Sequence, residues 1–252
     1  MINFKDKLSN FLNKKGVYMR NTESLNNNYK KRFEEYMKLI EGKEKEEKIL
    51  FAEYLIKIIV EYLNYNELIK VVEDRKKELF YTKIDSIYES LNKCYKRREK
   101  IKIKDRDMEI YNNKFMDINC TPMLISPYHR GKFCSTFMNF IRGKRENYTA
   151  KAVDFSANYY IKPMNIVVCR NRYHTYSDFR VRNQSIVQVD VGINYSDLYK
   201  KIHFTGEDYI YDNKERISAD LSRYVKNDMF FYSGVIFELS RVLLDKDKEN
   251  VE

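Results

Sequence analysis

The spacing of apolar residues changes along this chain from a helical period to a strand-like one, and this change limits the folds that it can adopt. Between residues 29 and 93, apolar side chains recur three or four positions apart, which places them on one face of a helix. Between residues 161 and 212, they stand in short runs or alternate with polar residues, as in β-strands. This order predicts an α+β fold, with an N-terminal helical region followed by a small mixed β-sheet core with flanking helices.

The helical patterns fall into separate segments. Helices are expected at about 26–42 and 44–63, and residues 67–93 fit either two helices or one kinked helix. The polar run from Asn64 to Asn66 predicts a turn, with Asn66 as the N-cap of the next helix. Residues 217–224 and 228–244 also have helical patterns, and the apolar stripe in the second of these predicts a core helix.

Four strand-like segments lie around a polar cluster. Residues 164–169 (MNIVVC) form a short apolar run, and residues 185–191 (SIVQVDV) alternate. Residues 199–204 and 209–211 flank Thr205-Gly206-Glu207, which predicts a hairpin. The cluster from Arg170 to Thr175 directly follows the first of these strands. A polar cluster between a strand end and a helix start is a common anion site.

The charge of the chain is basic and unevenly distributed. The net charge is +10 over 252 residues, and residues 1–106 hold 26 Lys and Arg against 18 Asp and Glu. We therefore expect a basic helical region over 1–106 and an α+β domain over 107–252. The basic excess favours DNA, RNA or an acidic protein as partner, and a solvated lysine-rich surface is the alternative. With 43% hydrophobic residues, the chain can bury a sizeable core.

Two basic clusters are candidate phosphate contacts. The stronger lies between residues 93 and 106, and Lys96, Arg97 and Arg98 are its centre. The alternative for this segment is a solvated linker between the two regions. The second cluster, His129, Arg130 and Lys132, follows the Ser126-Pro127 step and is expected on a loop that holds an anion or forms a surface turn.

The cysteines and the apolar runs indicate in which cellular compartment the protein is expected. The four cysteines show no CxxC spacing, the N-terminal residues lack the apolar core of a signal peptide, and no apolar run approaches the roughly 20 residues of a membrane span. We therefore expect a cytoplasmic protein with reduced thiols and no membrane partner. Four residues have side chains that can bind zinc: His129, Cys134, Cys169 and His174. Their spacing does not match a known zinc-binding motif.

A strand, a polar motif with histidine and a second strand with aspartate occur in that order between residues 120 and 212. This arrangement resembles the core of ParB/sulfiredoxin-like proteins, and of uncharacterised bacterial and phage proteins with a Gly-Asn-His-Ser type motif. The matching positions are Pro163, His174-Thr175, Asp190, Tyr195, Tyr199 and Gly206. Arg172 and Tyr173 stand where the family pattern has Gly and Asn, and Thr205 where it has an acidic residue. The resemblance implies a nucleotide or phosphodiester as ligand.

The chemistry of these residues leaves two classes of function open. His174 would act as a general base or hold a phosphate, and Asp190 would orient a histidine or bind a metal. Arg172, Arg180 and Arg182 would neutralise an anion, and Asn171 would take part in binding a phosphate or nucleic acid. The chain has no paired carboxylates, glycine-rich phosphate loop or nucleophile–base motif, so we favour a non-catalytic protein that binds nucleic acid or another partner. An enzyme with His174 at its site is the alternative, and the sequence assigns neither a cofactor nor an oligomeric state.

Overall fold

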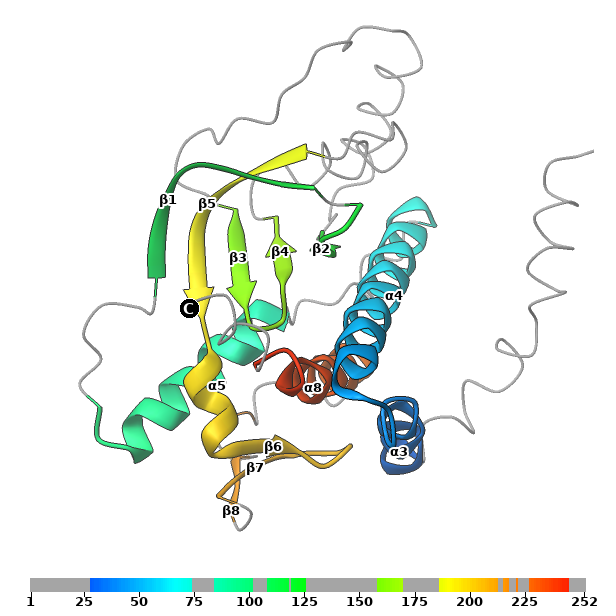
Figure 1. Cartoon of the computed structure of the whole chain (residues 1–252), viewed down its shortest axis with the longest axis vertical. Coiled ribbons are helices and arrows are strands. Elements are labelled where there is room, and N and C mark those ends of the chain that lie inside the picture. Colours follow the sequence, from blue (N-terminus) through cyan, green and yellow to red (C-terminus); the bar gives the residue numbers. More distant parts are fainter. Residues whose placement is uncertain are drawn as a thin grey trace, which may run out of the picture.

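The computed structural model describes residues 28–73, 84–101, 108–117, 119–125, 158–169, 186–212, 215–217, 221 and 227–244. These residues form helices and two small sheets, so the predicted α+β class with N-terminal helices is confirmed (Figure 1). The helices are α3 (Tyr29–Lys38), α4 (Lys45–Val72), α5 (Ile84–Arg98) and α8 (Asp228–Arg241).

The larger sheet has five strands in a mixed arrangement. In spatial order they are β1 (Met108–Asp117), β5 (Ile186–Asn194), β3 (Tyr159–Lys162), β4 (Ile166–Val168) and β2 (Met123–Leu124). The pairs β1–β5 and β3–β4 are antiparallel, whereas β5–β3 and β4–β2 are parallel. The strand predicted at 164–169 begins only at Ile166, because Met164 and Asn165 form the turn after β3, where Asn165 has a φ of 55°. The strand predicted at 185–191 is confirmed and continues to Asn194.

The smaller sheet contains the predicted hairpin. Strand β6 (Ile202–Phe204) pairs antiparallel with β7 (Tyr209–Tyr211), which pairs with β8 (Glu215–Arg216). The first predicted strand was too long, because residues 196–200 form the 3-10 helix η2 (Ser196–Lys200).

Helix α4 runs through the predicted turn at Asn64 to Asn66, so that prediction was wrong. Asn64 is buried, and its amide Nδ2 donates to the Met123 carbonyl at 2.6 Å while its Oδ1 accepts from the Ile125 amide at 3.0 Å. Asparagine weakens helices when its side chain bonds the neighbouring backbone. Here the side chain bonds the edge strand β2 instead, so the helix continues and is anchored to the sheet.

Helix α8 is the centre of the hydrophobic core. It packs against α3, α4, α5 and β6, and Figure 1 shows it between α4 and α5. The Tyr88 hydroxyl of α5 donates to the Ser233 carbonyl at 2.7 Å, and the Tyr209 hydroxyl lies 3.0 Å from the Ser233 Oγ. The two predicted regions therefore share one core, and the proposed boundary near residue 106 stays a prediction.

Candidate functional site

Most of the predicted site around His174 lies outside the described residues. These positions are His129, Arg130, Lys132, Asn171, Arg172, His174 and Arg180. Asp190 is described on β5, where its Oδ2 accepts a hydrogen bond of 2.9 Å from the Asn158 amide. The Asn158 side chain in turn donates to the Gln188 carbonyl at 2.9 Å. These bonds hold the start of β3 against β5, and a catalytic role for Asp190 stays a prediction.

The three basic residues chosen on α5 differ in their surroundings. Lys96 is only 8% exposed, so it contributes to packing rather than to an open surface. The Arg98 guanidinium lies 5.4 Å from the centre of the Tyr211 ring and donates to the Cys94 sulfur. Arg97 is exposed in the last turn of the helix, where a positive charge also complements the helix dipole. Of the three, Arg97 is therefore the best placed to meet a phosphate.

The fold adds two lysines to this end of α5. Helix η2 packs against α5, and its Lys200 and the following Lys201 act electrostatically on Tyr95 of α5. Burial raises the pKa of Tyr95, the carboxylates of Asp197 and Glu99 raise it further, and the two lysines oppose the rise. Lys200 and Lys201 are about a hundred positions from α5, and the prediction did not include them. The only sequence signal was their adjacency.

We define the basic end of α5 as five residues from two segments: Lys93, Arg97, Lys100, Lys200 and Lys201. All except Lys201 are exposed, and Lys201 is half-buried. Lys93 pairs with Glu89 at 2.8 Å, Lys200 with Asp197 at 2.6 Å and Lys201 with Asp212 at 3.4 Å.

Exposed pairs of this kind contribute little to stability, because water and salt screen them. A polyanion can therefore replace these carboxylates at small cost.

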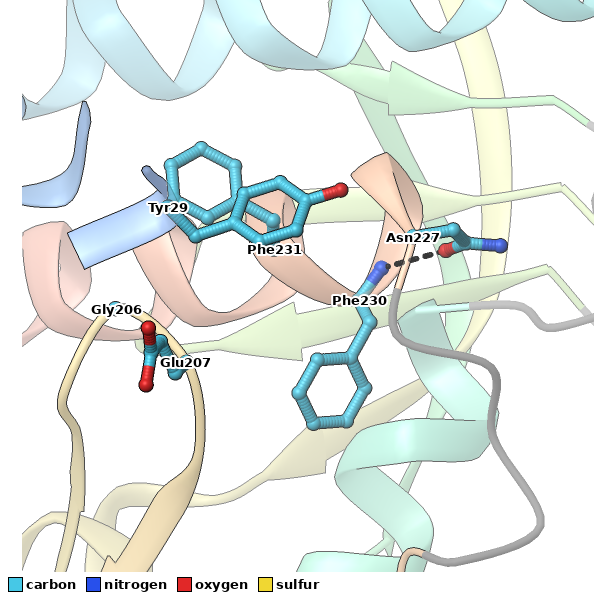
Figure 2. Close-up of a pocket in the computed structure, with 6 residues that line it drawn as sticks. All are labelled: Tyr29, Gly206, Glu207, Asn227, Phe230 and Phe231. Carbon is cyan, nitrogen blue, oxygen red and sulfur yellow. Dashed lines mark hydrogen bonds between the residues drawn. The ribbon is translucent and has the colours of Figure 1, made fainter. Parts of the chain in front are cut away.

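A pocket of about 180 Å³ opens at the start of α8 (Figure 2). Its six lining residues come from α3, the β6–β7 turn and α8: Tyr29, Gly206, Glu207, Asn227, Phe230 and Phe231. The Tyr29 and Phe231 rings stack with their centres 5.0 Å apart, and the Asn227 Oδ1 accepts from the Phe230 amide at 3.1 Å as the helix cap. Of these six lining residues, Glu207 is the one that carries a charge.

Two residues beside the pocket fix α3 to its neighbours. The Arg32 guanidinium lies 4.5 Å from the Phe231 ring centre, and it donates to the Tyr232 hydroxyl at 3.1 Å and to Asp228 at 3.4 Å. Gly206 has a φ of 96°, and a Cβ there would lie 2.9 Å from the Lys30 Cα, so glycine permits the turn to approach α3. These contacts describe a packed joint between α3, the β6–β7 turn and α8.

The described part of the chain contains no group of three His, Cys, Asp or Glu residues that could hold a metal ion. Of the four residues considered for zinc, Cys169 is described. It is buried, and burial raises the pKa of its thiol, which disfavours the thiolate form that binds metals. Among the helices that the structure describes, none is both long and apolar enough to span a membrane.

Comparison with known proteins identifies a family. A model of the DUF6710 family, described as a family of unknown function, matches residues 19–250, so the chain belongs to this family. No curated protein and no solved structure matches the chain.

Proposed function

We propose that this member of the DUF6710 family is a non-catalytic binding protein that contacts nucleic acid through the basic end of α5. The observation that supports this proposal is the packing of η2 against α5, which brings Lys200 and Lys201 close enough to act electrostatically on Tyr95 of the helix that carries Arg97. Phosphate backbones attract such clusters by Coulomb forces, and the release of condensed cations drives the association.

The composition of this surface also suits a flexible, sequence-independent contact. Tyr211 adjoins it, with the Arg98 guanidinium over its ring. Proteins bind single-stranded nucleic acids with such groups: aromatic and guanidinium groups stack on the bases, and lysines neutralise the phosphates. We therefore expect a preference for single strands over duplexes.

The proposal is tested by binding of the full chain to fluorescently labelled single-stranded DNA and RNA, measured by anisotropy over a series of salt concentrations. The affinity should fall with salt, with a slope of about −0.7 per phosphate neutralised. The double variant Arg97→Glu/Lys200→Glu should weaken binding by roughly tenfold or more, because it replaces two positive charges that contact phosphates with negative charges that repel them.

A charge-matched control separates a local contact from net charge. The variant Lys31→Glu/Lys38→Glu makes the same change in net charge at exposed positions of α3. If both variants weaken binding equally, or if the wild type does not bind at moderate salt, the basic end of α5 is not the contact surface. His174→Ala should leave the affinity unchanged, whereas a nucleotide or phosphodiester site at His174 predicts a loss of activity in that variant.

A further inference from the structure

Helix α4 is apolar on two sides, and one of these sides is not covered by the described structure. We define the outer face of α4 by its eight exposed apolar side chains: Leu50, Phe51, Tyr54, Ile58, Tyr62, Tyr65, Ile69 and Val72. Leu50 is 65% exposed and Tyr54 is 64% exposed. Single exposed apolar residues are common on protein surfaces, but an unbroken stripe of them usually marks an interface.

The outer face is continuous along the helix. Its members from Tyr54 to Val72 are spaced three or four residues apart, so they lie within about 120° of the helix circumference. From Leu50 to Val72 the stripe is about 33 Å long. Between Leu50 and Val72, Glu61 is the one charged residue of α4 in this sector, and Lys57 lies at the same edge one turn earlier.

The opposite side of α4 carries the contacts of the fold. Ile56, Ile59 and Leu63 are almost fully buried, and α4 packs there against α8 and β2. Figure 1 shows α4 at the margin of the described elements, with the sheet and α8 on one side of it. Two members of the outer face make described contacts: the Tyr62 ring centre lies 5.4 Å from that of Tyr232 on α8, and the Phe51 ring centre lies 4.1 Å from the Lys43 Nζ. All eight side chains of the outer face nevertheless stay exposed.

We propose that the outer face of α4 pairs with the outer face of α4 in a second copy of this chain. Eight side chains that are about half exposed, several of them aromatic, offer roughly 700 Å² of surface. This matches the about 800 Å² per partner of a standard stable interface. A two-fold dimer needs a patch that complements itself, and a stripe that is apolar along its whole length meets that condition.

The charges at the edge of the stripe indicate an antiparallel pair. We place the two-fold axis between the two outer faces, at the height of residue 59 along the helix and near the middle of the stripe. Lys57 of one copy then lies opposite Glu61 of the other, and symmetry repeats the pair. Lys57 Nζ already donates to the Asn119 carbonyl. An ammonium group has three donors, so this bond is compatible with a second contact. This inference is independent of the proposed nucleic-acid contact.

The test is the molar mass of the full chain by light scattering or sedimentation over the micromolar range. The wild type should reach about twice the 30.6 kDa mass of one chain. Ile58→Glu, which places a charge at the centre of the stripe, should raise the dimer dissociation constant at least tenfold. The control is Ile110→Glu on β1, because Ile110 is more exposed than Ile58 but lies away from α4. This control should remain dimeric.

A charge exchange tests the geometry and guards against misfolded variants. Lys57→Glu and Glu61→Lys should each weaken the dimer, and the double exchange should restore it, with unchanged circular dichroism in all three. A wild type that stays monomeric overturns the proposal and leaves the outer face to the N-terminal residues of the chain or to a different protein. A folded Ile58→Glu variant that dimerises like the wild type also overturns it.

Discussion

Helices α4 and α5 contribute to the same core, but the sides that they turn away from it differ. Away from the core, α5 presents charged residues such as Lys93 and Arg97, whereas α4 presents the apolar outer face. An ordinary surface helix resembles α5, with one apolar side and one polar side. A helix that is apolar on both sides is covered on both sides in its working state. The two proposals therefore assign different partners to the two helices, and each assignment can be tested residue by residue.

The largest expected effect separates the two sides of α4. Ile59 is 2% exposed and its neighbour Ile58 is 45% exposed. Ile59→Ala should lower the free energy of unfolding by about 2–5 kcal/mol, because it leaves a cavity in the core. Ile58→Ala should lower it by less than about 1 kcal/mol in the monomer. Urea denaturation at several protein concentrations measures both.

Denaturation at several protein concentrations also tests whether the outer face of α4 pairs with a second copy of the chain. If the outer face is an interface, the loss in Ile58→Ala grows with protein concentration, because dimerisation stabilises the wild type by mass action. If Ile58→Ala and Ile59→Ala lower the free energy of unfolding equally at low protein concentration, both sides of α4 are buried within the monomer.

The next effect concerns the joint between α4 and the sheet. Asn64→Ala leaves the Met123 carbonyl and the Ile125 amide without their partner, which should cost about 1–3 kcal/mol of stability. Asn66→Ala is the matched control in the same helix, because Asn66 is only partly buried. It should change stability by no more than about 0.5 kcal/mol. Similar losses in both variants would assign no special role to the bonds of Asn64.

A smaller effect distinguishes two neighbours on α5. Arg97→Ala should weaken nucleic-acid binding severalfold and reduce the salt slope by about 0.7, because one phosphate contact is lost. Lys96→Ala should leave the salt slope unchanged, since the Lys96 side chain is buried. Anisotropy titrations of the two variants decide this point, and an equal change of slope in both would contradict the assignment.

The smallest expected effect is a dependence of stability on alkaline pH. Burial, with contributions from Tyr232 and Asp228, raises the pKa of Tyr62 from 10.0 to about 12. The neutral phenol is therefore favoured in the folded state, and its contribution is fully present below pH 10.0. That contribution is lost as the pH rises toward about 12. Tyr62→Phe should reduce the loss of stability over this range, and phenolate absorbance should give the pKa directly.

The sequence predicts the described helices and the strands β4 to β7, because their apolar spacing is regular, but it predicts no strand at β1, β2, β3 or β8. It was misleading at Asn64 to Asn66, where a residue type that usually ends helices is satisfied by a strand distant in sequence. It also predicted too long a strand at 199–204, because Tyr199 is buried in a 3-10 helix whose face has the same local pattern as a strand.

The candidate site was less predictable than the fold. Lys96 and Arg97 are adjacent and chemically alike, yet tertiary packing buries one and exposes the other. Lys200 and Lys201 reach α5 only through the path of the chain after β5. A buried apolar stripe and an exposed one have the same spacing, so the pattern over residues 44–63 did not distinguish the outer face of α4 from its buried side. Sequence periodicity identifies apolar stripes but does not show which of them the rest of the chain covers.

The bonds of Asn64 have a consequence for misassembly. An unpaired strand at a sheet margin can recruit a strand from another molecule and begin aggregation. At β2, the Asn64 amide occupies the Met123 carbonyl and the Ile125 amide, two of the groups that an incoming strand would need. The body of α4 also lies alongside this margin. A single asparagine in a helix thus protects the sheet from intermolecular growth, and its loss should accelerate amyloid-type aggregation as well as unfolding.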